Sequence, residues 1–354
     1  MRVLPLSDSL YWDYVVRSVA AARRRVYVNQ FIVDARGLAD PEMQVRALLR
    51  ALGRKRARRV DVKLLVAASN TRDIAMANRT SLRFSSYCAI PCRVTRSDTT
   101  QSHCKYMIID DQIVLGSHNW EAAAFRGFLE DSIALIGAPG LTTKLVHHFS
   151  NQWSLADDVD HVPGDAANRL ARRAVFSIQP ERVRQHRWAW KSAPAVRLLT
   201  DGQYFQRAQT LIVHAKRSID LAMFYLAMPT SRASKSASRD LAMELVAAHH
   251  RGIQVRVVLD RDRSKDPYGS AVINKAAFEL LDRARVQVRF DDRRVVTHSK
   301  VLVVDGREAV VGSHNWTNAS LTTYREVSVD VRSDHLAAYY VDRISNMYRA
   351  GHRP

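Results

Sequence analysis

Short apolar runs alternate with amphipathic segments along most of this chain of 354 residues. Runs rich in Val, Ile and Tyr, such as RVYVNQFIV at 25–33 and VDVKLLVAA at 60–68, have the length and composition of buried strands. Segments of helical period lie between such runs, for example DLAMELVAAHHRG at 240–252. The alternation is typical of strand–helix–strand units, so it predicts an α/β fold with mostly parallel sheets.

This pattern of strands and helices occurs twice. Phe31 matches Phe224 at a shift of 193 residues, and His103 matches His298 at a shift of 195. Small loop insertions account for the difference between the two shifts. A repeat of this length predicts that two similar α/β units make up the chain.

The expected domains are an N-terminal one at 1–156 and a C-terminal one at 195–354. Residues 157–194 between them are polar, rich in arginine and interrupted by Pro and Gly, which is typical of a linker. Two interpretations of this linker stay open, a surface that stacks on bases and contacts phosphates, or a solvated connecting helix whose tryptophans pack on a domain. Its arginines and tryptophans are Arg169, Arg172, Arg173, Arg182, Arg184, Arg187, Trp188 and Trp190.

Composition adds a strong positive charge to this picture. Lys and Arg total 54 against 35 for Asp and Glu, a formal net charge of +19. Such an excess implies a polyanionic partner, either nucleic acid or an anionic membrane surface. The run RKRARR at 54–59 adds to the charge, or it is simply a solvated helix end. Hydrophobic residues make up 47% of the chain, enough to bury a core, so a globular protein is expected.

Three cysteines, Cys88, Cys92 and Cys104, are too few and odd in number for a disulfide framework, which fits a reducing compartment. Cys88 and Cys92 lack a second pair at zinc-ligand spacing, so no metal site is expected. Residues 1–22 have the wrong charge order for a signal peptide and are expected to form a helix. No apolar stretch approaches the roughly 20 residues of a membrane-spanning helix. A cytoplasmic protein without transmembrane segments is predicted, and the high Arg and Ala content favours a GC-rich bacterial genome.

Each repeat contains one copy of the same motif. The first reads HCKYMIIDDQIVLGSHNW from residue 103, and the second reads THSKVLVVDGREAVVGSHNW from residue 297. Both have His-x-Lys-x4-Asp, followed after a short turn by Gly-Ser-His-Asn-Trp, and a glutamate lies 11 residues after each Asn. Because several spacings coincide twice, the double motif is highly specific.

The spacing within the motif indicates chemistry on a phosphate. In an extended strand residues i and i+2 share a face, so His103 points with Lys105, and His298 points with Lys300. A histidine near neutral pKa attacks phosphorus or passes a proton, and a neighbouring lysine neutralises the non-bridging oxygens. Further hydrogen-bond donors to these oxygens are expected from Ser117, Asn119, Ser313 and Asn315.

The acidic residues of the motif have more than one possible role. Asp110 and Asp305, at the ends of apolar runs, belong to the candidate catalytic set, but they could equally bind turn amides or a ring nitrogen. Glu130 and Glu326 are candidates for a supporting role, since an acceptor on one ring nitrogen fixes the histidine tautomer.

The double motif resembles that of the phospholipase D superfamily, and the wording GSHNW is most similar to the nuclease-like branch. The resemblance covers nearly the whole chain. It implies that the halves pack about a pseudo-twofold axis so that both motifs form one active site, without any need for an oligomer. It also implies that His103 becomes phosphorylated while His298 protonates the leaving alkoxide, although the roles could be reversed. Lys105 and Lys300 would replace a metal, so no cofactor and activity in chelator are expected.

The first half departs from the pattern at Glu121, which stands where the second half has Thr317. A carboxylate near a phosphate site could restrict the substrate or tune the nucleophile, but we expect this side chain to face solvent.

The superfamily includes enzymes with different substrates, so the motif alone does not identify the phosphodiester. The net charge and the motif wording favour a nuclease that cuts DNA or RNA. The alternative is a phospholipase D or a phosphatidyl transferase similar to cardiolipin synthases, since basic surfaces also attract anionic lipid. A third possibility is a nucleic-acid binding module that retains the fold without activity.

Overall fold

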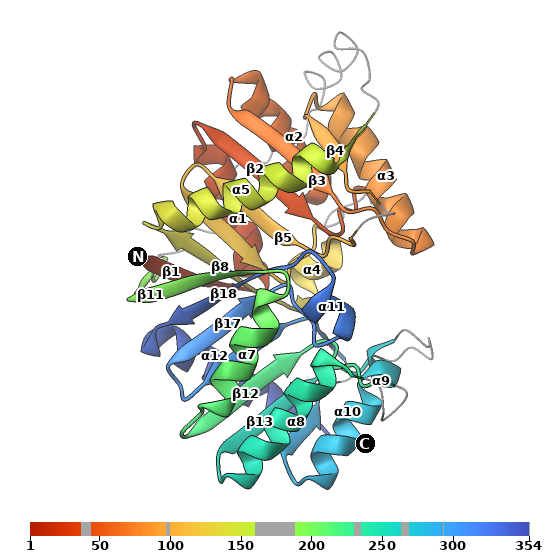
Figure 1. Ribbon diagram of the computed structural model, residues 1–354. Helices are drawn as coiled ribbons and strands as arrows, with labels where there is room; N and C mark the ends of the chain where they lie inside the picture. The colour runs from red at the N-terminus through yellow and green to blue at the C-terminus, as the bar shows by residue number, and fades with distance from the viewer. Residues whose placement is uncertain are drawn as a thin grey trace.

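The computed structural model describes residues 1–36, 44–96, 100–159, 188–229, 235–262, 269–292 and 294–353. Two α/β halves are stacked along the long axis of the molecule, with the N-terminal half uppermost in Figure 1. All six linker arginines lie outside the described residues. Trp188 and Trp190 are described, and both rings lie against Tyr14, with centroids at 5.3 and 6.1 Å. For the tryptophans, therefore, the structure shows packing on the first half.

The sheet of the first half has nine strands in the order β10-β1-β8-β6-β5-β2-β3-β4-β9. Neighbours β2, β3 and β4 run parallel, and the other neighbouring pairs are antiparallel. The strands are β1 (Arg2–Ser7), β2 (Arg25–Gln30), β3 (Asp61–Val66), β4 (Cys92–Val94), β5 (Lys105–Ile109), β6 (Gln112–Gly116), β8 (Asp131–Ile136), β9 (Asp157–Asp158) and β10 (Lys191–Ser192).

The sheet of the second half has seven strands in the order β11-β18-β17-β16-β12-β13-β14, of which β12, β13 and β14 run parallel. The strands are β11 (Ala195–Thr200), β12 (Ser218–Met223), β13 (Gln254–Leu259), β14 (Gln287–Phe290), β16 (Lys300–Val304), β17 (Glu308–Gly312) and β18 (Val327–Arg332). The predicted α/β class and its duplication are confirmed. The sheets are mixed rather than mostly parallel, because β5–β6 and β16–β17 are joined by tight turns that connect antiparallel neighbours.

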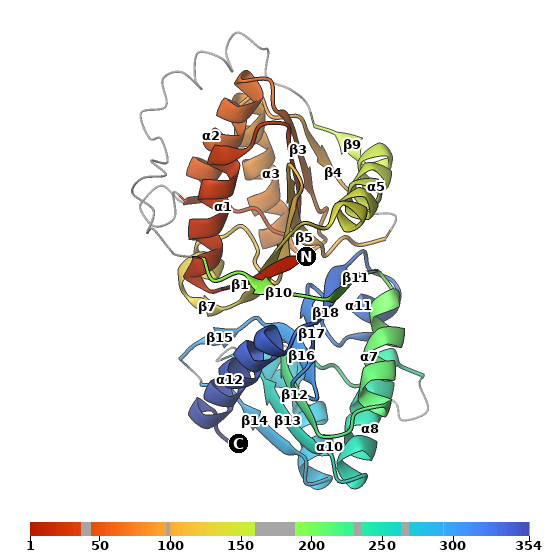
Figure 2. The ribbon, with the colours of Figure 1, turned by 90° about the vertical axis from the view of Figure 1, so that its left-hand side faces the viewer.

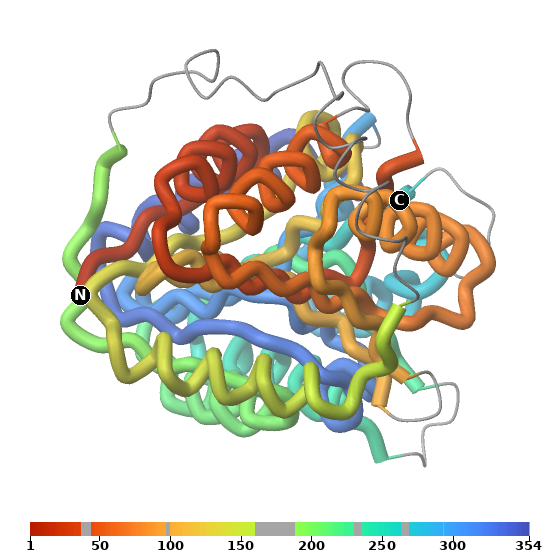
Figure 3. The backbone as a smooth tube through the Cα atoms, turned by 90° about the horizontal axis from the view of Figure 1, so that it is seen from above, coloured from red at the N-terminus to blue at the C-terminus, as the bar shows by residue number. Residues whose placement is uncertain are grey.

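Helices cover both faces of each sheet. In the first half α1, α2 and α3 lie on one face and α5 on the other (Figure 2), an arrangement also visible from above (Figure 3). In the second half α7, α8 and α10 lie opposite α12. The helices are α1 (Ser9–Ala21), α2 (Gln44–Ala57), α3 (Arg72–Tyr87), α4 (Ala122–Arg126), α5 (Pro139–Leu155), α7 (Gln203–Val213), α8 (Ala237–His250), α9 (Ser270–Ile273), α10 (Lys275–Arg283), α11 (Asn318–Thr322) and α12 (Asp334–Ala350).

The N-terminal segment corrects one prediction. Residues 1–22 were expected to be helical throughout, but Arg2–Ser7 form β1, and only Ser9–Ala21 are helical. Six residues of β1 pair with β8, a strand more than 120 residues away, so a distant partner determines this local conformation. No helix in the described part of the chain is long and apolar enough to cross a membrane.

The two halves share a buried core. Ile133 and Leu135 of β8 belong to the same apolar cluster as Val301 of β16 and Leu336 and Tyr340 of α12. A short parallel pair, β7 (Phe128–Leu129) with β15 (Val296–Thr297), also joins the halves. These contacts place the starts of β5 and β16, where the two motifs begin, at the boundary between the halves.

Candidate active site

The two motif histidines meet at the boundary between the halves and line one cavity. His103 lies just before β5, and its backbone N–H donates to the carbonyl of Arg325 at 2.8 Å. His298 lies just before β16, and its N–H donates to the carbonyl of Leu129 at 2.9 Å. The main chain at each histidine is therefore held by the opposite half.

Each histidine ring is also bound to a glutamate of the opposite half. Nδ1 of His103 lies 3.0 Å from Oε1 of Glu326, and Nδ1 of His298 lies 2.9 Å from Oε1 of Glu130. Both glutamates are fully buried. A carboxylate at Nδ1 selects the tautomer that leaves Nε2 unprotonated, so each ring has a nitrogen available for chemistry.

Burial keeps both rings neutral. Loss of hydration lowers the pKa of His103 to about 4, although the charge of Glu326 opposes this shift. Burial, followed by the charges of Lys300 and Lys105, holds the pKa of His298 well below its usual value. At neutral pH both imidazoles are therefore uncharged, which is the form that attacks phosphorus or accepts a proton.

The two motif lysines lie two residues after the histidines and are almost fully buried. Nζ of Lys105 donates to the carbonyl of His103 at 2.9 Å, and Nζ of Lys300 donates to that of His298 at 2.5 Å. Burial lowers their pKa values to about 8 and about 7. An anionic group close to these lysines would favour their charged forms and would be neutralised by them.

The serines and asparagines that follow each motif lie in different environments. The hydroxyls of Ser117 and Ser313 donate to Glu130 and Glu326, so they orient the carboxylates that hold the histidines. The asparagines instead line the cavity, and their side-chain oxygens have no hydrogen-bond partner in the described part of the chain. Direct phosphate contact stays a prediction for all four residues, Ser117, Asn119, Ser313 and Asn315.

The two motif aspartates lie at the opposite ends of β5 and β16 from the lysines. Asp110 accepts hydrogen bonds from the backbone amides of residues 23–25, at 2.7–3.1 Å. Asp305 accepts from the amides of residues 216–218, at 2.7–3.2 Å. Both were included in the catalytic set, with binding of turn amides as the other interpretation. The hydrogen bonds of both carboxylates agree with the second interpretation, in which they bind backbone amides.

The cavity that contains the histidines has a volume of about 650 Å³. Its wall contains aromatic, aliphatic, polar and acidic residues, and among the described lining residues there is no Lys or Arg. The aromatic residues of the wall are Phe31, Phe128, Phe224, Tyr225 and Tyr324, and the carboxylic acids are Glu121, Asp260, Asp262 and Glu326.

Glu121 belongs to this wall, so its expected position facing solvent is wrong. Its Oε1 accepts from Nδ2 of Asn119 at 3.1 Å, and burial raises its pKa to about 7. The short α4 follows Glu121 and packs against α1, which directs the preceding residue inward.

Sequence reasoning also missed residues that support the histidines. The ring of Phe31 lies edge-on to His103, and that of Phe224 edge-on to His298, each with centroids 4.7 Å apart. The same rings also lie close to the lysines. Nζ of Lys105 is 4.8 Å from the centroid of Phe31, and Nζ of Lys300 is 4.9 Å from that of Phe224. These two phenylalanines occupy matching positions in the two repeats. That match was the one feature of the sequence that could have indicated a shared role.

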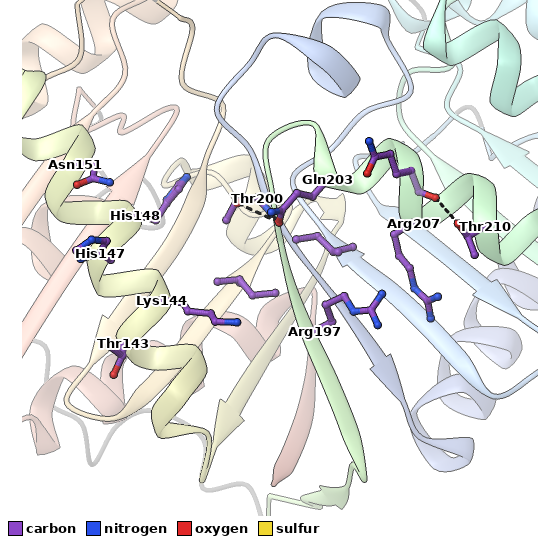
Figure 4. A pocket seen from close by; sticks show the side chains of 13 residues that line it. Thr143, Lys144, His147, His148, Asn151, Arg197, Thr200, Gln203, Arg207 and Thr210 are labelled. Carbon is purple, nitrogen blue, oxygen red and sulfur yellow. Dashed lines mark hydrogen bonds between the residues drawn. The ribbon is translucent and has the colours of Figure 1, made fainter.

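A second hollow, of about 1070 Å³, lies between α5 and the segment formed by β11 and α7 (Figure 4). Lys144, His147 and His148 line it from α5, and Arg197 and Arg207 line it from the other side. Arg207 is paired with Glu308 and Asp330. None of the motif residues lines this hollow, so it is separate from the histidine site.

Comparison with protein families identifies the class. The family model described as "Cardiolipin synthase, PLD-like domain" matches residues 15–153 and again residues 209–348. The chain therefore belongs to the phospholipase D-like family.

Individual relatives agree with this assignment. The human (Homo sapiens) mitochondrial cardiolipin hydrolase is 27% identical over 137 residues, covering 39% of this chain and 48% of the relative. Phospholipase D of Rickettsia conorii is 28% identical over 102 residues, covering 29% and 48%. The chain thus spans about half the length of these curated relatives. The phosphatidylserine synthase of Haemophilus influenzae Rd KW20 shares the fold, with a TM-score of 0.72 and 14% identity over 99% of this chain and 87% of that one.

Proposed function

We propose that this chain is a phosphodiesterase that acts on phospholipid headgroups, by hydrolysis or by phosphatidyl transfer. The observation that carries the proposal is the wall of the histidine cavity, which contains aromatic and acidic residues and has no Lys or Arg among its described residues. Such a wall accommodates one phosphate, at the histidines and lysines, with uncharged or cationic groups on either side. The names of the relatives, a cardiolipin hydrolase and a phospholipase D, support the same substrate class.

The proposed reaction has two steps. Nε2 of His103 attacks phosphorus, a P–N bond forms, and the bond to the leaving alcohol breaks as His298, protonated when the anionic substrate binds, gives up its proton to the alkoxide. His298 then takes a proton from water or from an acceptor alcohol, which attacks phosphorus and breaks the P–N bond. Lys105 and Lys300 neutralise the non-bridging oxygens throughout. One chain supplies all four groups, so the proposed site needs no oligomer.

A nucleic acid fits this wall less well. A polynucleotide carries a phosphate on every nucleotide, and phosphates beside the scissile one would approach Glu121, Asp260 and Asp262 without a lysine or arginine among the described lining residues. The preference for a nuclease drawn from the sequence therefore gives way to the lipid alternative. A nuclease stays the second candidate because of the net charge of +19. The cytoplasmic location stays a prediction.

The test uses purified protein in excess EDTA, with vesicles of cardiolipin, phosphatidylglycerol or phosphatidylcholine and, in parallel, end-labelled single- and double-stranded DNA and RNA. We expect release or exchange of a lipid headgroup, loss of this activity in His103→Asn, and no nucleic acid cleavage. Cleavage of nucleic acid alone, falling steeply with salt, would establish the second candidate instead. Activity that EDTA abolishes would contradict the two-histidine chemistry for either substrate.

A further inference from the structure

Two buried carboxylic acids lie beside His298, and the two corresponding positions in the described part of the first half hold no acid. Asp260 follows β13 and Asp291 follows the neighbouring parallel strand β14, so both extend from the same edge of the second sheet. Asp260 is 0% exposed and Asp291 is 1% exposed. Their carboxyl groups lie close together, because both accept from the same backbone N–H, that of Thr297.

Both acids bind the same backbone amide. The N–H of Thr297 donates to Oδ1 of Asp260 at 2.6 Å and to Oδ2 of Asp291 at 3.1 Å. The remaining oxygens are also bound, Asp260 by the hydroxyl of Ser270 and Asp291 by the N–H of Arg261 at 3.0 Å. These hydrogen bonds fix the positions of both acids, so the pair forms a rigid frame. The backbone amide of Thr297 is bound to this frame.

Thr297 immediately precedes His298, and the frame and the first half together define the position of this histidine. On one side Thr297 is held by the two acids. On the other side the N–H and the ring of His298 are held by Leu129 and Glu130. A change in the frame would therefore move the imidazole relative to the phosphate and to His103.

The first half lacks this frame. The position that corresponds to Asp260 is Ala67, because the N–H of each donates to the carbonyl at the end of the preceding strand. The position that corresponds to Asp291 is Thr95, whose hydroxyl accepts from the N–H of Ala68 as Asp291 accepts from that of Arg261. The two repeats therefore share the backbone hydrogen bonds at these positions, but only the second repeat has the acids. The two histidines are consequently in unequal environments.

The electrostatics of the pair agree with a role in proton transfer. Two buried carboxylates this close cannot both ionise easily, and burial, with the charge of Asp291 second, raises the pKa of Asp260 to about 8. In the described part of the chain, the charged groups nearby include Glu130, which binds the ring of His298, and the lysines Lys105 and Lys300. They also include Asp262, which lines the same cavity, and Arg261, whose guanidinium stacks on Phe290 at 5.0 Å. A negative charge shared by the pair favours the protonated form of His298, which the leaving alcohol requires.

We propose that Asp260 and Asp291 are positioning residues that hold His298 as the proton-carrying histidine, which leaves His103 as the nucleophile. The inference rests on the proposed two-histidine reaction but not on the choice between lipid and nucleic acid. The same roles for the two acids are therefore expected whichever phosphodiester is the substrate.

The experiment compares Asp260→Ala with Asp260→Asn on bis(4-nitrophenyl) phosphate. Alanine removes the acceptor for Thr297, whereas the oxygen of asparagine can still accept from Thr297 and its amino group can donate to the hydroxyl oxygen of Ser270. We expect Asp260→Ala to lower kcat by about tenfold or more with KM within about twofold, and Asp260→Asn to retain most of the activity. Asp292→Asn, whose carboxylate is paired with Arg294 outside the cavity, is the matched control.

A second readout identifies the step. Nitrophenolate leaves without a proton, so His298 is needed mainly to activate water in the second step. We expect Asp260→Ala to release one equivalent of nitrophenol rapidly, with a phosphohistidine on residue 103, and then to turn over slowly. Equal losses in the Ala and Asn variants, a change confined to KM, or a phosphohistidine on residue 298 would overturn the inference. Thermal unfolding checks the fold, and if Asp260→Ala is unfolded, Asp291→Ala removes the other acceptor and is judged by the same criteria.

Failure of the inference can be separated from failure of the proposed function. If wild type cleaves the nitrophenyl ester but no lipid, the lipid assignment is wrong while the kinetic comparison still decides the role of the pair. If wild type cleaves lipids and shows no burst in Asp260→Ala, the inference is wrong and the function stands. Absence of cleavage of every ester by wild type would overturn both.

Discussion

At the scale of single residues, the environment of Glu121 explains why one substitution between the repeats matters. The residue stands where the second half has Thr317, and its carboxyl group lies inside the cavity wall rather than in solvent. The sequence showed the difference but not its position, because the direction of the side chain depends on how α4 packs on α1. Burial of a carboxyl group without a cationic partner raises its pKa and makes its ionised form unfavourable.

Replacement of Glu121 is therefore expected to change the pH dependence of stability. The folded pKa is about 7 and the ordinary value is 4.5, so the folded state binds more protons than the unfolded state between these values. The penalty for ionised Glu121 is fully present at pH 8 and decreases progressively as pH falls from 7 towards 4.5. We expect Glu121→Gln to raise the free energy of unfolding by about 1–2 kcal/mol at pH 8 and to have little effect at pH 5.

Urea denaturation of both proteins at pH 8, 7, 6 and 5 measures this difference. The matched control is Glu279→Gln, which replaces an exposed glutamate of α10. A difference between Glu121→Gln and wild type that is the same at all four pH values would show that the carboxyl group does not titrate in this range.

At the scale of the elements, local pattern predicted strands and helices well where each segment buries its own apolar face. The runs at 25–33 and 60–68 contain β2 and β3, and the segment at 240–252 overlaps most of α8. The sequence failed where a distant partner decides the conformation, as in β1, which pairs with β8. It also failed on strand direction, because a short turn after each His-x-Lys strand produces a hairpin.

The aspartates at those hairpin turns are expected to stabilise the fold rather than to catalyse. Asp305 has a positive φ of 56° and binds three amides of residues 216–218. Asn tolerates the same φ, but it lacks the charge and presents a donor to backbone donors. We expect Asp305→Asn to lower the free energy of unfolding by about 1–2 kcal/mol and to change kcat by less than about threefold.

Denaturation and steady-state kinetics on the same preparation separate the two roles. Asp111→Asn is the control in the matching turn of the first half, since the carboxylate there is exposed and pairs with the side chain of Arg24. A fall of a hundredfold or more in kcat with unchanged stability would return Asp305 to the catalytic set.

At the scale of the whole molecule, the site is assembled from crossed contacts. The double motif and its resemblance to the phospholipase D superfamily predicted that both histidines share one site, and the structure brings them to one cavity. The crossed pairing of glutamates with histidines could not be predicted. Glu130 and Glu326 lie 11 residues after matched asparagines, and this spacing is the same whether a glutamate serves its own half or the other.

The crossed pairing makes a quantitative prediction for a double-mutant cycle. Glu130 and His298 form one buried unit, so removal of either group leaves the other without its partner. We expect Glu130→Gln and His298→Asn to be non-additive in the free energy of unfolding, with a coupling of about 1 kcal/mol or more. Glu130→Gln and His103→Asn, from the same half, should add within about 0.5 kcal/mol. Coupling to His103 instead of His298 would mean that each glutamate serves its own half, and the crossed assembly of the site would be wrong.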